Sequence, residues 1–360
     1  MDIMHHLFRW TCACLLCVLP SLLPSQTTEP IRRSYVEEKH LKNIRQLTFG
    51  GDNAEAYFSF DNRYLTFQAT NPAWGDACDQ IYEMSVADGA PKKPSLISTG
   101  KGKTTCSYFM PGNQEILYAS THHQGADCPE APRVIQGKYV WAIHPEFDIF
   151  VADRSGKVLR QLTDNPGYDA EATVAPDGSR IVFTSTRSGD LELWTMKPDG
   201  SDLRQVTHDL GYDGGAFFTP DSKQLVFRAS RPSTPDEIET YKRLLSQGLV
   251  QPTALEIFIC NVDGSDLRQV TRLGKANWAP YMSPDGSRIL FSSNHHSASG
   301  RQFNIFSVRP DGTGLEQITF DPVFDSFPMF SFDGKHLVFA SNRYNGGTRD
   351  TNVFLAEWKD

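Results

Sequence analysis

The stretch RQLTDNPGYDAEATVAPDGSRIVF, residues 160–183, contains the pattern that decides the fold. It opens with Arg-Gln-Leu-Thr at 160–163, passes through a polar turn to Pro-Asp-Gly at 176–178, and ends with an alternating apolar run at 181–183. Alternation with a period of two places one row of side chains on the buried face of a strand. Pro and Gly favour tight turns, because Pro fixes φ and Gly tolerates a positive φ. We therefore interpret the stretch as strands joined by tight turns.

This pattern recurs along the whole chain. Segments related to Arg-Gln-Leu-Thr begin at residues 45, 95, 160, 204, 268 and 316. Turns related to Pro-Asp-Gly lie at 60–62, 111–113, 176–178, 220–222, 284–286 and 332–334. A second alternating run follows in each unit, and a further Asp-Gly turn closes most units, at 88–89, 199–200, 263–264 and 311–312. Because Asp-Gly is a strong hairpin signal, each of the six units is predicted to contain four short strands, as a propeller blade does.

The order of the strands indicates that the units close into a ring. The chain starts with a lone fourth strand at 43–48 and ends after a third strand at 352–358, so the first segment can complete the last unit. Closure removes the free edges that an open sheet has to protect. A solenoid is the structural alternative, but no unit has the polar character of a capping repeat. The sequence predicts an all-β, six-bladed β-propeller of four-stranded blades over residues 43–360, closed by the N-terminal strand.

The N-terminus differs from the repeats. Two His and one Arg precede an apolar run at 11–23, and Ser25 offers a small residue for cleavage. This layout is typical of a secretory signal peptide, which we place at 1–25, followed by an extension at 26–42. The run is too short and too interrupted by Pro to cross a membrane, and a buried N-terminal helix is the alternative. We expect an exported protein, periplasmic or secreted, without a membrane span in the mature chain.

Charge and cysteine content limit the partners and the chemistry. The net charge of −8 lacks the basic footprint that phosphates require, so no nucleic-acid partner is expected. Four of the seven cysteines lie outside the signal segment, and an even number in an exported chain permits disulfides. We predict one disulfide within the group Cys78, Cys106 and Cys128, and a free, buried Cys260. A zinc site of these three cysteines with His122 is the alternative.

The second alternating run contains Ile-Phe in three units, at 149–150, 257–258 and 305–306. The Leu-Thr, Pro-Asp-Gly and Ile-Phe elements together resemble the repeats of TolB-type propellers, the family of the periplasmic component of the Tol-Pal envelope system. They also resemble the propellers that precede the catalytic domain of prolyl-oligopeptidase-type peptidases. The resemblance covers about residues 43–358 and implies a fold rather than a function. The chain shows no separate α/β domain before the repeats, no hydrolase domain and no Gly-x-Ser-x-Gly elbow. We therefore expect neither an orthodox TolB role nor a peptidase activity.

All long insertions fall on one face of the predicted ring. They lie at 71–78, 121–147, 231–255, 295–303 and 343–351. Loops above a rigid scaffold commonly carry function, so this loop-rich face is the predicted binding face.

The insertion in the fourth unit contains a predicted helix at about 235–247. Thr234 can cap it, Pro occupies the first helical position, and acidic residues complement the dipole of its first turn. Its apolar stripe is expected to pack on the loops below rather than to form a partner groove. The stripe consists of Ile238, Tyr241, Leu244 and Leu245.

Polar residues recur at corresponding positions on the loop-rich face. One ring precedes or starts the first strands: Asn53, Thr104, Asp169, Asp213, Asn277 and Asp325. A second ring follows the second strands: Asn71, His122, Arg187, Arg231, His295 and Arg343. A third set begins the third strands: Gln80, Asp148, Glu192, Glu256, Asn304 and Asn352. The candidate ligand-binding residues are Asp169, Glu171, Arg187, Asp213, Arg231, Asn277, Asp325, Arg343, His122 and His295.

Two interpretations of these rings stay open. In the structural one, Asx side chains satisfy turn amides and Arg pairs with the carboxylate of the third strand. In the functional one, the rings line the mouth of the central channel, a natural concave site, and grip a glycan, a peptide terminus or a carboxylate.

The adjacent His pairs at 122–123 and 295–296 occupy matching positions in the second and fifth units. Some propeller lyases that act on uronate sugars, which these repeats resemble distantly, use a His-bound metal. A metal-assisted carbohydrate lyase or hydrolase using His122, His295 and nearby acids is therefore the alternative function.

The leading hypothesis is a non-catalytic binding or scaffolding propeller of the cell envelope, without catalytic residues, metal or cofactor. Its expected partner is an envelope protein, a glycan or a peptide at the loop-rich face. A sensor or partner-docking subunit of an envelope complex is a third possibility. We expect a monomer.

Overall fold

The computed structural model describes residues 35–87, 93–130 and 132–360. The predicted signal peptide at 1–25 and the Asp-Gly turn at 88–89 lie outside the described residues.

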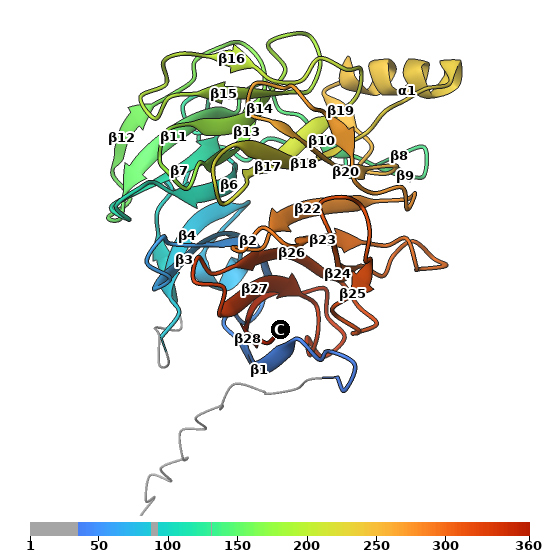
Figure 1. The fold of residues 1–360 in the computed structure, drawn as a ribbon. Helices are drawn as coiled ribbons and strands as arrows, with labels where there is room; N and C mark the ends of the chain where they lie inside the picture. The colour runs from blue at the N-terminus through green and yellow to red at the C-terminus, as the bar shows by residue number, and fades with distance from the viewer. Residues whose placement is uncertain (1–34, 88–92, 131) are drawn as a thin grey trace, which may run out of the picture.

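Six four-stranded antiparallel sheets follow one another around a ring (Figure 1). Blade one contains β2 Asp52–Phe58, β3 Tyr64–Thr70, β4 Gln80–Ser85 and β5 Ser95–Leu96. Blade two contains β6 Thr104–Phe109, β7 Glu115–Ser120, β11 Asp148–Asp153 and β12 Val158–Gln161. Blade three contains β13 Asp169–Val174, β14 Ile181–Ser185, β15 Glu192–Met196 and β16 Arg204–Gln205. Blade four contains β17 Asp213–Phe218, β18 Gln224–Ala229, β20 Glu256–Asn261 and β21 Arg268–Gln269. Blade five contains β22 Asn277–Met282, β23 Ile289–Ser293, β24 Asn304–Val308 and β25 Glu316–Gln317.

Blade six joins the two ends of the described chain. It contains β26 Asp325–Phe330, β27 His336–Ser341, β28 Asn352–Trp358 and β1 Leu41–Gln46. In Figure 1 the blue strand β1 lies beside the red β28, and Gln46 pairs with Phe354 across them. The predicted six-bladed propeller, closed by the N-terminal strand, is confirmed. The strand begins before the predicted residue 43 because Leu41 is also buried, at 3% exposure.

The Thr of each Leu-Thr element explains why this motif repeats. The hydroxyl of Thr163 accepts a hydrogen bond from the amide of Ile149 at 2.9 Å and donates to the carboxylate of Asp148 at 3.0 Å. In four other blades a threonine hydroxyl likewise accepts a hydrogen bond of 2.9 Å from a backbone amide of the third strand. These threonines are Thr48, Thr207, Thr271 and Thr319. One side chain thereby ties the fourth strand to the start of the third in each of these blades.

The core lies between neighbouring blades, and every second strand contributes to it. Each of the six second strands places a fully buried aromatic ring at the same position: Phe67, Tyr118, Phe183, Phe227, Phe291 and Phe339. Burying one such side chain stabilises a fold by about 1.5–3 kcal/mol, so the repeated position contributes strongly to the ring.

The insertions of blades two and four meet above the ring. The first contains β8 Val134–Ile135, β9 Lys138–Tyr139 and β10 Trp141–Ala142, and the second contains α1 Pro235–Leu245 and β19 Leu249–Val250. β10 pairs with β19 through Trp141 and Val250, which links the two insertions. Blade one adds a 3-10 turn, η1 Pro72–Trp74.

The helix forms as the sequence indicates. Thr234 and Glu237 make a reciprocal capping box at its N-terminus. Leu244 is buried with Leu249, and Tyr241 and Leu245 pack against a cluster that includes Ile143. The stripe therefore packs on the loops below, as expected. Among the described residues, no helix is long and apolar enough to cross a membrane.

Candidate functional site: a cup on the propeller axis

All six first strands contain a β-bulge at the same position. The pairing register breaks there in every blade, and the bulged residue takes a positive φ. The bulged residues are Glu55 (φ 52°), Cys106 (45°), Glu171 (58°), Gly215 (56°), Ala279 (48°) and Phe327 (55°). For residues other than Gly such a backbone costs about 1–3 kcal/mol each, and bulges of this kind often re-aim side chains at functional sites. All six line one cavity of about 750 Å³.

Aromatic rings close the bottom of this cavity. Tyr57 of blade one and Phe217 of the opposite blade four meet with ring centroids 5.4 Å apart. Tyr108 lies 5.9 Å from Tyr57, and Tyr281 lies 5.2 Å from Phe217. Because rings from opposite blades touch, the axis is filled at this level. We call the space above them, lined by the six bulged residues, the cup.

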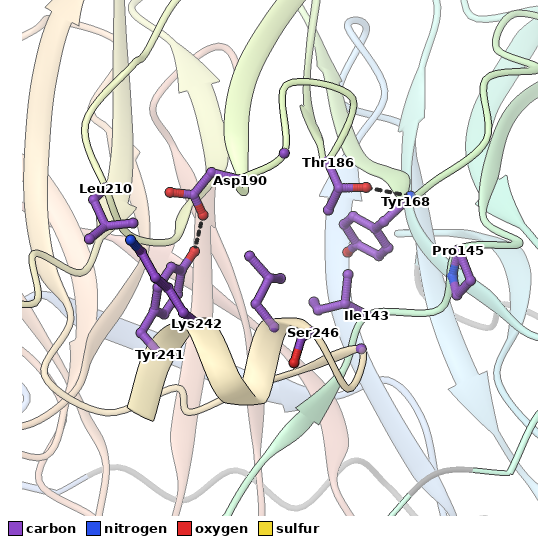
Figure 2. A pocket seen from close by; sticks show the side chains of 12 residues that line it. Ile143, Pro145, Tyr168, Thr186, Asp190, Leu210, Tyr241, Lys242 and Ser246 are labelled. Atoms are coloured by element: carbon purple, nitrogen blue, oxygen red, sulfur yellow. Dashed lines mark hydrogen bonds between the residues drawn. The ribbon is translucent and has the colours of Figure 1, made fainter. Parts of the chain in front are cut away.

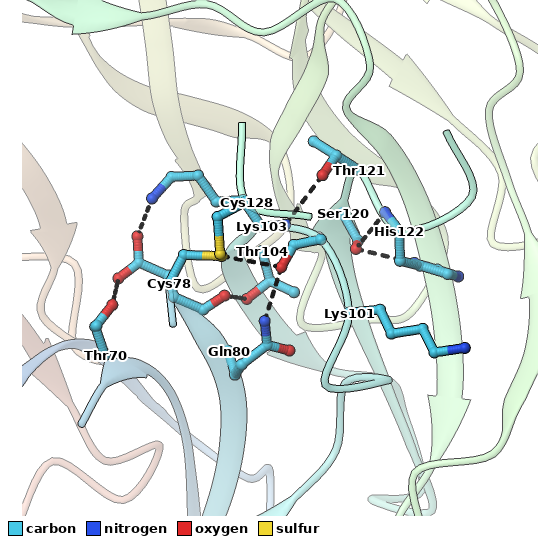
Figure 3. Close-up of a disulfide and its surroundings, with 12 residues drawn as sticks. Thr70, Cys78, Gln80, Lys101, Lys103, Thr104, Ser120, Thr121, His122 and Cys128 are labelled. Carbon is cyan, nitrogen blue, oxygen red and sulfur yellow. Dashed lines mark hydrogen bonds and ion pairs between the residues drawn. A yellow bond between two sulfur atoms is a disulfide. The ribbon is translucent and has the colours of Figure 1, made fainter. Parts of the chain in front are cut away.

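The blade-two insertion roofs part of the cup. Trp141 of β10 lines it and packs against Trp278 of blade five, with ring centroids 5.2 Å apart. A disulfide between Cys78 and Cys128 ties this insertion to blade one (Figure 3). Both of its cysteines line the cup, as does the neighbouring Lys103, which pairs with Asp79. Of the other described cysteines, Cys106 and Cys260 are free thiols, and Cys260 is buried.

Glu171 and Arg228 form a buried ion pair at the wall of the cup. The Nη2 atom of Arg228 donates to Glu171 Oε1 at 2.6 Å, and each of the two side chains is only 9% exposed. Tyr212 Oη donates to the same carboxylate at 2.5 Å, and Gly215 N donates at 2.7 Å. Burial alone would raise the pKa of Glu171, but the charge of Arg228 and these donors outweigh it and lower that pKa.

The glycine in blade four makes this pair possible. A Cβ atom at Gly215 would lie 1.8 Å from Arg228 Nη1, so a larger residue there would displace the guanidinium. Arg228 belongs to the second strand, β18, yet it lines the cup and reaches Glu171 of blade three. Its guanidinium also lies 4.9 Å from the ring centroid of Tyr212 and 5.4 Å from that of Trp141.

Glu55 is the second bulged carboxylate of the cup. Its Oε2 atom accepts hydrogen bonds from Cys106 Sγ at 2.9 Å and from Tyr57 Oη at 3.3 Å. Burial is the main cause that raises the pKa of Glu55, and these two donors only partly oppose it. The pKa of the Cys106 thiol is raised well above its usual range, by burial and then by the charge of Glu55, so this thiol stays protonated.

Of the ten candidate residues from the sequence, Glu171 lines the cup. The three arginines pair with the aspartates of their own first strands instead. Arg187 Nη2 donates to Asp169 at 2.7 Å, Arg231 Nη2 to Asp213 at 3.0 Å, and Arg343 Nη2 to Asp325 at 2.9 Å. The expected pairing of Arg with the third-strand carboxylate is therefore wrong, because the start of the first strand lies closer to the guanidinium. Ligand contact by these residues stays a prediction.

The remaining candidates have defined contacts within their blades. Asn277 donates to the carbonyl of Leu255 at 2.9 Å and accepts from Ser293 at 2.6 Å. His122 Nδ1 lies 2.9 Å from Ser120 Oγ, and its ring centroid lies 4.3 Å from that of Phe150. In blade five, His295 makes the same contacts with a serine at 2.8 Å and with a phenylalanine at 4.6 Å.

These histidines occupy the position that arginines occupy in blades three, four and six. Arg231, for example, lies over Phe258 of its third strand in the same way, 4.9 Å from the ring centroid. Burial is the main cause that lowers the pKa of both histidines. Within the part of the chain that the structure describes, no three or more His, Cys, Asp or Glu side chains gather as a metal site.

Of the six bulged residues, sequence reasoning named only Glu171 as a ligand-binding candidate, and it named Cys106 only as a disulfide or zinc candidate. They lie two positions after the first polar ring in every blade, so the same alignment of repeats contains them. They can be recognised because the residue type at this position varies from blade to blade. Glu occurs there in two blades, and Cys, Gly, Ala and Phe occur in one blade each, whereas the first polar ring contains only Asn, Asp and Thr.

A second cavity, of about 580 Å³, lies under helix α1. Figure 2 shows Tyr241 reaching from the helix toward Asp190, to which its hydroxyl donates a hydrogen bond. Ile143 and Tyr168 line both this cavity and the cup, so they form part of the wall between the two spaces.

Comparison with known proteins agrees with this architecture. Residues 139–248 match the family model described as the TolB beta propeller domain, PD40. The putative TolB of Agrobacterium tumefaciens is similar with a TM-score of 0.56 and 18% identity, over 86% of this chain and 91% of that one. TolB of Acinetobacter baumannii matches with a TM-score of 0.55 and 18% identity, over 83% of this chain and 64% of that one. An oligogalacturonate lyase in complex with manganese has a TM-score of 0.51 and 12% identity, over 88% of this chain and 93% of that one.

The fold and the cup define a six-bladed β-propeller whose axial channel is closed at one end. The matched segment, which covers less than half of the chain, is similar to the repeats of TolB-type PD40 β-propellers. The similarities to solved structures, all below 25% identity, show the fold alone.

Proposed function

We propose that this chain is an exported, non-catalytic binding propeller of the cell envelope, which holds a polar ligand such as the end of a glycan or peptide in the cup. The observation that carries the proposal is the cup itself. It is concave, closed below by aromatic rings and partly roofed by an insertion, and its volume of about 750 Å³ lies in the range of small-molecule sites.

The walls of the cup combine the two kinds of group that such a site needs. Trp141, Trp278 and Phe327 supply aromatic faces, and Gln68 and Glu55 supply polar atoms that fix orientation. A disulfide and a strand pairing hold the roof, so little ordering is left for a ligand to induce. The proposed export rests on the signal-peptide layout of residues 1–25.

The test is to block the cup without disturbing the propeller. Ala279→Phe introduces the residue that blade six already carries at the same bulge, so the backbone there accepts it. The mature protein is screened by thermal shift against envelope glycans and peptides, and hits are measured by calorimetry. Ala279→Phe should abolish binding with little change in melting temperature. Leu203→Phe, on the outer surface, is the matched control and should bind as the wild type does. Unchanged binding by Ala279→Phe would show that the ligand binds elsewhere.

A further inference from the structure

The cup has one more carboxylate than cations. Its described lining contains four carboxylates, from Glu55, Asp79, Glu130 and Glu171, and three cations, from Lys103, Arg133 and Arg228. Lys103 pairs with Asp79, and Arg228 pairs with Glu171. Glu130 and Arg133 are exposed at the rim. The remaining acid is Glu55, and it lies in the bulge ring.

We propose that the cup binds a ligand through a primary ammonium group, with Glu55 as its counter-ion. This inference rests on the proposed function and names the chemistry of the ligand. It begins from a comparison inside the bulge ring, where only blades one and three carry a carboxylate.

Glu171 shows what a glutamate at this bulge does in this cup. It binds the guanidinium of Arg228, a cation that lies over two aromatic rings. Glu55 has the same backbone conformation at the same position of blade one. Within the described ranges, no Lys, Arg or His nitrogen forms an ion pair with Glu55, whose protein partners are the neutral thiol of Cys106 and the hydroxyl of Tyr57.

Both of those donors use one oxygen, Oε2, which leaves Oε1 to accept from a ligand. Four aromatic side chains line the same cup as Glu55: Tyr57, Phe217, Trp278 and Phe327. A cation near aromatic faces gains cation–π attraction, most strongly where water is excluded. An ammonium ion would also neutralise a carboxylate whose burial is otherwise unfavourable, and a neutral hydroxyl would not.

The experiment compares amines with their acetylated counterparts. Glucosamine is paired with N-acetylglucosamine, and dialanine with N-acetyl-dialanine, so that the two arms separate an amino sugar from a peptide amino terminus. Each is titrated by calorimetry at neutral pH into the wild type, Glu55→Gln and Glu239→Gln. Glu239→Gln is the matched control, because Glu239 lies exposed on helix α1.

The wild type should bind at least one of the amines, and its acetylated partner should bind about tenfold more weakly or worse. Glu55→Gln should weaken binding of the amine by a similar factor and leave binding of the acetylated partner unchanged, without lowering the melting temperature of the ligand-free protein. Glu239→Gln should match the wild type. The inference is overturned if neither amine binds at millimolar concentration, if acetylation has no effect, or if Glu55→Gln binds the amine normally. If the only ligand found were neutral and Ala279→Phe abolished its binding, the ammonium inference would be overturned and the proposed function would stand.

Discussion

The first polar ring and the bulge ring lie two residues apart on the same six strands, yet they do different things. Asp169 starts β13, is fully buried and pairs with Arg187 of its own blade. Glu171 follows on the same strand, faces the axis, and is bound by Arg228 from the neighbouring blade. The first position repeats in kind around the propeller, and the second varies. Repetition therefore marks the contacts that hold each blade together, and variation marks the residues that line the cup.

The strongest test of the structural half of this comparison is the removal of β1. Protein that begins at residue 47 should lose several kcal/mol relative to protein that begins at residue 35. Burial of Leu41 and Ile44 alone contributes about 3–6 kcal/mol, at about 1.5–3 kcal/mol for each, and the truncation also leaves β28 as an open edge. Urea unfolding measures the difference. Melting within a degree or two of the longer protein would show that the ring does not depend on this strand.

The next largest effect is expected in the polar rings. Arg343 is 1% exposed and pairs with Glu38 at 3.0 Å and with Asp325 at 2.9 Å. Arg343→Leu leaves these two carboxylates buried without a cationic partner, so the free energy of unfolding should fall by about 3–5 kcal/mol. Lys335→Leu is the control, because the Lys335 pair with Asp333 is exposed and is expected to contribute at most about 1 kcal/mol. If the Arg343 variant kept its stability but no longer bound a ligand of the wild type, the polar rings would have a binding role rather than a structural one.

The third prediction concerns the roof of the cup. The Cys78–Cys128 disulfide closes a loop over a sequence separation of 50 residues. Its loss in the variant with both cysteines changed to Ser should cost about 2–4 kcal/mol, because the unfolded chain regains freedom. Denaturant unfolding with and without reductant provides the control, since reductant should destabilise the wild type and leave the variant unchanged. A wild type that is indifferent to reductant would show that the roof does not depend on the bond.

The fold could be predicted because each blade repeats the same local sequence signals for turns and strands. The helix at 235–245 was equally clear, since its cap and acidic first turn are local features. A concave site at the mouth of the central channel was one of the predictions, but of its ten candidate residues only Glu171 lines the cup. The other bulged residues were not named as ligand-binding candidates, because a bulge turns one residue toward the axis and the periodicity of the sequence does not indicate where a bulge occurs. The Arg228–Glu171 pair joins positions 57 residues apart, and it forms only because Gly215 leaves room between them.

The smallest expected effect is a pH dependence of stability that comes from Glu55 in the bulge ring. Burial raises the pKa of Glu55 in the folded protein, so the folded state binds this proton more tightly than the unfolded state does. Stability from Glu55 is then fully present below its unfolded pKa, about 4.3, and is lost as the pH rises through the higher folded value. Glu55→Gln removes this loss. In the absence of ligand, the variant should melt slightly above the wild type near neutral pH, and the difference should shrink as the pH falls toward about 4. Melting curves across this range measure it, with Glu239→Gln expected to follow the wild type. If the melting temperatures of Glu55→Gln and the wild type changed in parallel with pH, the carboxylate of Glu55 would be as well solvated as one on the surface. Burial of charge would then not distinguish the bulge ring from the rest of the protein surface.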